Sequence, residues 1–395
     1  MPRSLSELPG GVRVSDLVAL GVLAEHLPPS AMDAALAKAG LSDGRVRLLP
    51  LRFTLMYVVA LSLYRDVAYE EVLRCLLEGF RWLGEEPPEV ATKGAVTQAR
   101  ARLGADAARF LFESLAAPMS KPETKGAWYR SWLTVAVDGS TVLLPDSQAN
   151  AGRFGYANEP GRASYPLARY ACLCETGTHA AFAAALRPYA SGEHEMLRSM
   201  LGSLRPGMLL LADRGYMSYD LWKQCQATGA DLLWRANSTW TLERRKGLPD
   251  GSWLADLLPP VARRREEDPV EVRVVMYRVA GAAGPVRLVT TVLDPGQAPA
   301  QELAELYAER WEVEGMFDEM KTHLKGRGAT LRSKTPDLVE QEFWGFMLAH
   351  RALRSLMHEA ALKRQLDPDE VSFKHTVSVV KRTLPGRPGL SPREG

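Results

Sequence analysis

The sequence predicts an α/β fold: a mixed sheet flanked by helices, with a helical region before it and a β-rich segment inserted into it. Apolar residues recur at helical spacing over residues 1–125. Strand patterns then alternate with short helical ones over 126–236, which is typical of a sheet covered by helices. Two long helical patterns follow, at roughly 299–325 and 336–364.

The first region is expected to be mostly helical. Helical patterns occupy residues 15–27, 53–64 and 68–84. The apolar run 53–64 is flanked by Arg52 and Arg65 and is shorter than the about 20 residues that a bilayer span requires. We therefore expect a buried helix there and no membrane partner.

A short helix is expected over residues 92–104, with Thr92 as its N-cap and Gly104 as its stop. Such a helix could enter a DNA groove, and a plain surface helix is the alternative. The candidate DNA-binding residues, interpreted as exposed, are Lys93, Gln98, Arg100 and Arg102.

Two acids follow strand patterns in the next region. Asp138 ends "WLTVAVD" and Asp213 ends "GMLLLAD". Strands of this apolar kind end at the rim of a sheet, where sites tend to form. Each Asp alone is typical of a turn, but two such strand ends make a candidate site.

Residues 237–292 are expected to form a β-rich insertion, because charged, turn-rich stretches surround an alternating pattern at 271–279. The end of the chain, 383–395, is expected to be loose. From Lys321 onward, 14 Lys and Arg stand against 8 Asp and Glu, although the net charge of the chain is only +2. This basic end is either a phosphate-binding surface or a solvated face.

The cysteines and the missing motifs exclude several classes of protein. Cys172 and Cys174 belong to no C-x-x-C pair, so we interpret them as small core residues of a protein in a reducing cytosol. The sequence contains no G-x-x-x-x-G-K-[ST], G-x-S-x-G or H-E-x-x-H motif. A nucleotide cofactor is therefore not expected.

The helical segment 307–321 contains the candidates for the third acid of the site. With roughly 100° per residue, Tyr307, Arg310, Glu314 and Lys321 fall within one arc of about 60°. Glu314 borders the apolar stripe, and Asp318 is its rival. Arg310 bridging Glu314 as an i,i+4 pair is the structural alternative to a metal and phosphate site.

The remaining acids of this segment are expected on a solvated face of the helix, opposite the apolar stripe. They are Glu309, Glu312 and Glu319.

The spacing of Tyr307, Arg310, Glu314 and Lys321 resembles the Tyr-Arg-Glu-Lys signature of DDE transposases of the bacterial insertion-sequence-four family. "VAVDGST" resembles the first catalytic Asp segment of that family, and "LLLADRGYMSYDLW" resembles the second. The resemblance covers most of residues 45–345.

The resemblance implies an RNase H-like core that the β-rich insertion interrupts before the catalytic Glu helix. The expected regions are a helical DNA-binding domain (1–125), the first part of the core (126–236), the insertion (237–292), the second part of the core (293–365) and a basic tail (366–395).

The resemblance also implies that Asp138, Asp213 and Glu314 bind two Mg²⁺ or Mn²⁺ ions and cut double-stranded DNA at terminal inverted repeats. A freed 3′-hydroxyl then attacks the opposite strand to make a hairpin, and later attacks target DNA. Phosphates of the DNA end would be contacted by Tyr307, Arg310 and Lys321. A Trp would stack on a flipped base, and the candidates are Trp240, Trp253 and Trp234.

A homodimer on DNA in the bacterial cytoplasm is expected by the same resemblance. Two alternatives remain: an RNase H-like nuclease without strand transfer, and a transposase-derived DNA-binding protein that keeps the acids without using them.

Overall fold

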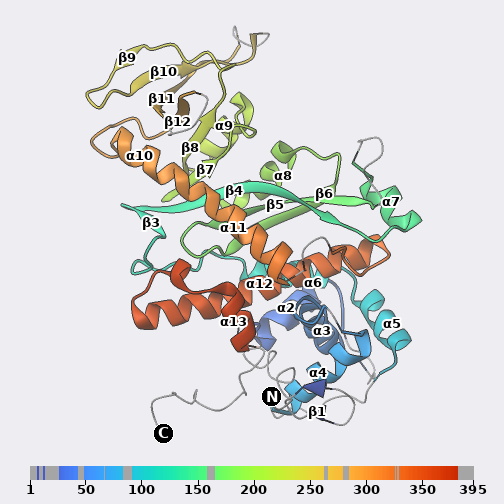
Figure 1. Ribbon diagram of the computed structural model, residues 1–395. Helices are drawn as coiled ribbons and strands as arrows, with labels where there is room; N and C mark the ends of the chain where they lie inside the picture. The colour runs from blue at the N-terminus through green and yellow to red at the C-terminus, as the bar shows by residue number, and fades with distance from the viewer. Residues whose placement is uncertain are drawn as a thin grey trace.

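A central sheet with helices on both faces organises the molecule (Figure 1). This confirms the predicted mixed α/β fold. The expected helix at 15–27 lies mostly outside the described residues, and the expected loose end at 383–395 lies wholly outside them. The computed structural model describes residues 7–8, 12–13, 26–42, 49–65, 67–82, 91–157, 165–261, 266–278, 284–324, 326 and 329–380.

The N-terminal helices pack together on one side of the sheet (Figure 1). As predicted from its apolar run, α3 (Leu51–Leu63) is buried on almost every side, and it packs against the long α12 (Pro336–Arg364). No helix among the described residues is long and apolar enough to cross a membrane. The other elements here are β1 (Glu7–Leu8), β2 (Val12–Arg13), α2 (Pro29–Lys38), α4 (Tyr69–Trp82), α5 (Lys93–Leu103) and α6 (Asp106–Leu115).

Both predicted ends of α5 are confirmed. The Thr92 hydroxyl accepts a hydrogen bond from the Ala95 amide and caps the N-terminus. Gly104 ends the helix with φ of 66°, a left-handed conformation that glycine adopts without a Cβ penalty.

The central sheet has ten strands in the described part of the chain, in the order β6-β5-β4-β7-β8-β12-β11-β10-β9, with β3 beside β4. β7 pairs in parallel with both β4 and β8, and the other pairs are antiparallel. The strands of the first part are β3 (Trp128–Tyr129), β4 (Trp132–Leu143), β5 (Leu167–Glu175), β6 (Ala181–Pro188), β7 (Met208–Ala212) and β8 (Asp231–Ala236). Between them lie α7 (Gln148–Phe154), α8 (Glu193–Met200), η2 (Leu201–Ser203) and α9 (Tyr219–Gln226).

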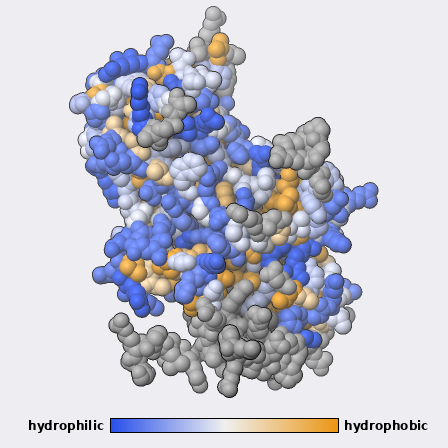
Figure 2. Space-filling view, viewed as in Figure 1, coloured by the Kyte–Doolittle hydropathy of each residue, from blue (hydrophilic) through white to orange (hydrophobic). Residues whose placement is uncertain are grey.

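The segment expected to be β-rich does form strands, and these continue the central sheet. β12 pairs with β8 of the first part, so the inserted strands add to its edge. The inserted strands lie in the upper part of the molecule, and mostly hydrophilic side chains cover its surface there (Figure 2). These strands are β9 (Lys246–Gly247), β10 (Trp253–Leu257), β11 (Val270–Tyr277) and β12 (Val286–Thr290).

One helical run, which we call the Glu helix, crosses the face of the sheet over β4 (Figure 1). It matches the predicted 299–325 but is not a regular α-helix, because a 3₁₀ segment and a π segment interrupt it. Its parts are α10 (Ala300–Leu306), the 3₁₀ segment η4 (Tyr307–Trp311), α11 (Glu312–Asp318) and the π segment η5 (Glu319–Leu324). After α12, which matches the predicted 336–364, come η6 (Pro368–Glu370) and α13 (Phe373–Val380).

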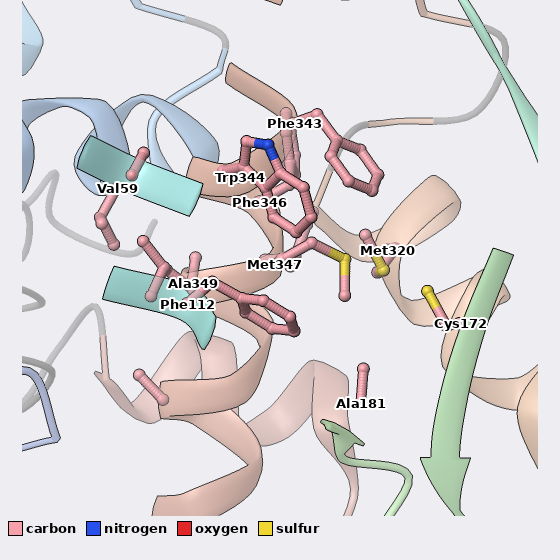
Figure 3. Close-up of a cluster of buried hydrophobic side chains, with 14 of the residues drawn as sticks. Val59, Phe112, Cys172, Ala181, Met320, Phe343, Trp344, Phe346, Met347 and Ala349 are labelled. Carbon is pink, nitrogen blue, oxygen red and sulfur yellow. The ribbon is translucent and has the colours of Figure 1, made fainter. Parts of the chain in front are cut away.

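Alternate residues of β4 face two hydrophobic cores. Ala136 belongs to the core that the N-terminal helices and α12 share with the Glu helix. Val135 and Val137 belong to the opposite core, which α8 and α9 cover. Figure 3 shows the first core, including Phe112, Trp344, Met347 and Cys172. Cys172 and Cys174 are both buried, which confirms their prediction as core residues.

Close packing of α12 against α3 predicts a large effect at Gly345. A Cβ there would lie 2.6 Å from the carbonyl oxygen of Val58 and 2.9 Å from its Cγ1. Gly345→Ala should therefore lower the free energy of unfolding by about 1–3 kcal/mol, measured by urea denaturation. Gly152→Ala, in α7, is the matched control, because nothing lies within 4 Å of its added Cβ. Equal stability of the two variants would contradict this account of the contact.

Candidate active site

Two aspartates lie side by side where β4 and β7 diverge. The last paired residues of these parallel strands are Ala136 and Leu211, and both face the core of the Glu helix. Asp138 and Asp213 each come two residues later, so they continue on that face, and neighbouring strands are about 4.8 Å apart. The two carboxylates therefore meet beneath the Glu helix.

The expectation that Asp138 ends its strand is wrong. β4 continues to Leu143, because its residues go on pairing with β5 after β7 has ended. Asp138 thus lies within the strand but at the rim of its parallel pairing. Asp213 follows the end of β7, as expected, and its Oδ1 accepts a hydrogen bond of 2.8 Å from the Gly215 amide.

Glu314 reaches the same place from α11, and Arg310 joins it to Asp138. One guanidinium nitrogen of Arg310 donates to Asp138 Oδ2 at 3.1 Å, and the other donates to Glu314 Oε1 at 3.3 Å. Arg310 is only 6% exposed, so its charge faces these acids. The predicted i,i+4 bridge is thus present, and it includes a third residue from a distant strand.

The electrostatics of Asp138 confirm that all three acids are close. Burial raises the pKa of Asp138, and the Gly139 amide and the Arg310 charge oppose that rise. The charges of Asp213 and Glu314 raise the pKa further, since like charges disfavour the ionised form. Three carboxylates in one place are therefore costly without a cation.

Lys321 completes the arc predicted from helical spacing. Its ammonium donates to the Ser140 hydroxyl on β4, and burial lowers its pKa. With Asp138, Ser140 and Glu314 it lines an open hollow of about 330 Å³, large enough for a phosphate group. The rival acid, Asp318, borders the same hollow, and both acids are exposed; Asp318 accepts a 2.6 Å hydrogen bond from the Thr322 hydroxyl, whereas Glu314 pairs with Arg310.

Tyr307 lies at the end of β7, next to Asp213. It is 5% exposed, and its hydroxyl donates to the Ala212 carbonyl at 3.1 Å, next to Asp213. Burial raises its pKa. The phenol therefore ties the Glu helix to the end of β7.

The solvated face expected for the Glu helix is wrong, because Glu319 is buried and both Glu309 and Glu312 are half-buried. Glu319 is buried, and its carboxylate accepts hydrogen bonds from His350 at 2.8 Å and from Arg354. Glu312 is half-buried and accepts one of 2.6 Å from His179. The reason is that α12 and η6 cover this face. The sequence signal was the pair His350 and Arg354, at i,i+4 spacing on one face of α12.

Among the described residues, one group of three side chains has ligand atoms within 4.8 Å of one another: His179, Glu312 and Asp369. Burial would lower the pKa of His179, but its bonds to Glu312 and Glu319 raise that pKa to about 9. Both ring nitrogens of His179 are already engaged, because Nε2 contacts Glu312 and the Arg354 guanidinium lies against Nδ1. We therefore interpret the group as a buried ion network.

The predicted DNA-binding face of α5 is only partly exposed. Lys93 and Gln98 are exposed, as expected. The expectation that Arg100 is exposed is wrong, because it is 3% exposed and donates to Gln341 at 2.8 Å and Ser333 at 3.0 Å. Arg102 is half-buried and donates to the Leu49 carbonyl at 2.5 Å. Arg100 therefore ties α5 to α12, and Arg102 ties α5 to the segment just before α3.

The three Trp candidates differ in exposure. Trp234 is fully buried against Trp222 and has no face left for a base. Trp253 is half-buried, with its indole donating to the Leu242 carbonyl at 3.4 Å. Trp240 is half-buried and lines an open hollow of about 460 Å³ together with Tyr219, so it retains the geometry for stacking.

The donor set of the three acids fits the ions expected from the sequence. Asp138, Asp213 and Glu314 offer only carboxylate oxygens, which Mg²⁺ and Mn²⁺ prefer. The Arg310 guanidinium between two of them occupies a position where positive charge is stabilised.

Comparison with known proteins agrees with this geometry. The family model for the N-terminal part of insertion element 4 transposases matches residues 17–113, and that for the transposase DDE domain matches 133–351. The transposase InsG for insertion sequence element IS4 of Escherichia coli (strain K12) is 30% identical over 380 residues, covering 94% of this chain and 84% of that protein. The putative transposase InsZ of the same strain is 29% identical over 216 residues, covering 54% and 70%.

A solved structure shares the fold. The cryo-EM structure of the piggyBac transposase synaptic complex with hairpin DNA aligns with a TM-score of 0.50 and 11% identity, over 92% of this chain and 79% of that one. Together with the transposase DDE domain, this supports the RNase H-like fold that the resemblance implied. The chain belongs to the insertion-sequence-four family of DDE transposases and is a DNA-cleaving transposase of an insertion sequence.

Proposed function

We propose that this transposase cuts double-stranded DNA at the terminal inverted repeats of its insertion sequence and joins the freed ends to target DNA. Asp138, Asp213 and Glu314 would hold two divalent metal ions for both steps. The proximity of these acids, which come from three separate segments of the chain, supports this proposal most strongly: Asp138 and Glu314 line one hollow and share Arg310, and Asp213 follows the strand paired with that of Asp138.

Each step exchanges one phosphodiester oxygen for another. A water first attacks the phosphorus at the transposon end, the P–O bond breaks, and a 3′-hydroxyl leaves. That hydroxyl then attacks the opposite strand to give a hairpin; a second water reopens the hairpin, and the 3′-hydroxyl finally attacks target DNA. Two divalent ions held by Asp138, Asp213 and Glu314 would activate the attacking oxygen and stabilise the leaving one.

The cations beside the acids would position the DNA. Lys321 points into the hollow from the Glu helix, where it can donate to a phosphate oxygen. Arg310 would exchange its bonds to Asp138 and Glu314 for a phosphate when ions enter. Tyr307 would act by holding the Glu helix against β7. Trp240 is the best-placed Trp for a flipped base.

The DNA-bound assembly is inferred by analogy. The piggyBac structure is a synaptic complex with hairpin DNA, and we infer that this chain likewise acts on hairpin DNA, as a homodimer that brings two ends together in the bacterial cytoplasm. The regions stated from the sequence stand as proposed domains, with Lys93 and Gln98 as the α5 residues available to DNA.

One assay distinguishes transposition from the two alternative functions. Purified protein is incubated with its flanking DNA and Mg²⁺, and the ends are mapped. Hairpins and strand-transfer products support the transposition chemistry, whereas blunt or nicked products alone support a nuclease without strand transfer. Binding without any cleavage, in Mn²⁺ as well, supports a DNA-binding protein that no longer uses its acids.

Glu314→Gln should abolish cleavage and leave binding of the transposon end nearly unchanged, because it removes a metal ligand and no DNA contact. Cleavage is followed on labelled end DNA, and binding is followed by fluorescence anisotropy. Asp318→Gln, a change of the rival acid in the same hollow, is the control and should keep cleavage within a few-fold. Full cleavage by Glu314→Gln would rule out its role as a ligand.

Arg310→Ala should reduce hairpin yield at least tenfold while Mn²⁺ binding is retained or tightened. The physical reason is that Arg310 compensates Asp138 and Glu314, so its removal leaves more negative charge for the ion. Hairpins are counted on denaturing gels, and Mn²⁺ binding is measured by calorimetry, with Arg310→Lys for comparison. Loss of Mn²⁺ binding together with the hairpin would show instead that Arg310 only supports the local structure.

A further inference from the structure

A buried ion network lies behind the Glu helix, on the side away from the hollow. Glu319 is its centre: it is 8% exposed and accepts hydrogen bonds from His350 at 2.8 Å and from the Nε of Arg354 at 3.0 Å. A second Arg354 nitrogen donates to its other oxygen, and His179 Nδ1 lies 3.5 Å from that oxygen. Burial alone would raise the pKa of Glu319, but these partners hold it well below its usual range.

The ring of His179 also touches the Glu helix itself. A Cβ at Gly315 would lie 3.2 Å from the His179 Cε1, so glycine permits this close approach one residue after Glu314. His179 has φ of 53°, a left-handed conformation that is costly for a non-glycine residue. The ion network offsets that cost and fixes the helix from behind.

Glu319 is also the first residue of the π segment η5. In a regular α-helix, Lys321 would follow Glu314 by two turns. Its side chain would then point roughly 20° away from that of Glu314 around the helix axis. A π turn holds more residues than an α turn, so Lys321 is rotated further back. That rotation directs its ammonium to Ser140 on β4 and into the hollow beside Asp138.

We propose that Glu319 is a positioning residue for Lys321. Held by Arg354 and His350, it maintains the π turn that directs the Lys321 ammonium to the DNA phosphate. This inference rests on the proposed phosphate contact of Lys321. Glu319 itself touches neither the hollow nor the three acids, so its effect on DNA must pass through Lys321.

A double-mutant cycle on DNA affinity tests the coupling without any cleavage. Affinity for end DNA is measured against salt concentration with no divalent metal present. Lys321→Ala should reduce the slope of log affinity against log salt by about 0.9, the value for one phosphate contact. Glu319→Gln should reduce it by the same amount, and the double variant should reduce it no further, because both changes remove one contact.

The cycle tests the phosphate contact of Lys321 separately from the positioning role of Glu319. An unchanged slope for Lys321→Ala would overturn its phosphate contact and this inference with it. A reduced slope for Lys321→Ala with a normal slope for Glu319→Gln would overturn only the positioning role, as would reductions that add in the double variant.

Two further variants exclude a general loss of structure. Glu342→Gln is the matched control: Glu342 is 1% exposed on α12 and pairs with Arg65 at 3.3 Å, far along the helix from the network. It should lower the melting temperature but keep the normal slope. Replacing the pair together, Glu319→Leu with Arg354→Met, should recover stability, since apolar residues often replace buried ion pairs without loss. Its slope should stay reduced, and a normal slope there would overturn the proposal.

Discussion

The parallel pairing of β4 with β7 is the constraint on which the site depends. It places Asp138 and Asp213 at equivalent positions of neighbouring strands, on the face that the Glu helix crosses. The charges of Asp213 and Glu314 repel that of Asp138, and burial increases the cost of the Asp138 charge. Arg310 offsets this cost in the structure, and divalent ions would do so during catalysis. A site that is unstable without cations is well suited to bind them.

The two sides of the Glu helix have different surroundings: one faces an open hollow, and the other packs against buried charged groups. Toward the sheet it presents Glu314 and Lys321 to an open hollow. Toward α12 it is held by buried charges centred on Glu319. Rigid support from behind keeps the residues in front within the narrow geometry that phosphoryl transfer requires. The 3₁₀ and π segments of the helix are consistent with these two requirements acting on one short stretch of chain.

The sequence predicted what depends on local pattern. Helical spacing placed Glu314 and Lys321 on one side, and capping chemistry set the ends of α5. It failed where the outcome depends on distant partners: Glu319 is buried because Arg354 and His350 on α12 donate hydrogen bonds to it, and Arg100 is buried because Gln341 accepts a hydrogen bond from it. The strand was predicted to end at Asp138, but β4 continues because it still pairs with β5 after its pairing with β7 has ended. A single sequence shows none of these pairings.

The central claim, that three acids share divalent ions, is tested most directly by iron-mediated cleavage of the protein itself. Fe²⁺ replaces Mg²⁺, ascorbate and peroxide are added, and the hydroxyl radicals formed at the bound iron cut the nearby backbone. Mass spectrometry should find cuts in the segments around Asp138, Asp213 and Glu314, and excess Mg²⁺ should suppress all three together. Cuts confined to the surroundings of His179 and Asp369, with none near Asp213, would contradict the account.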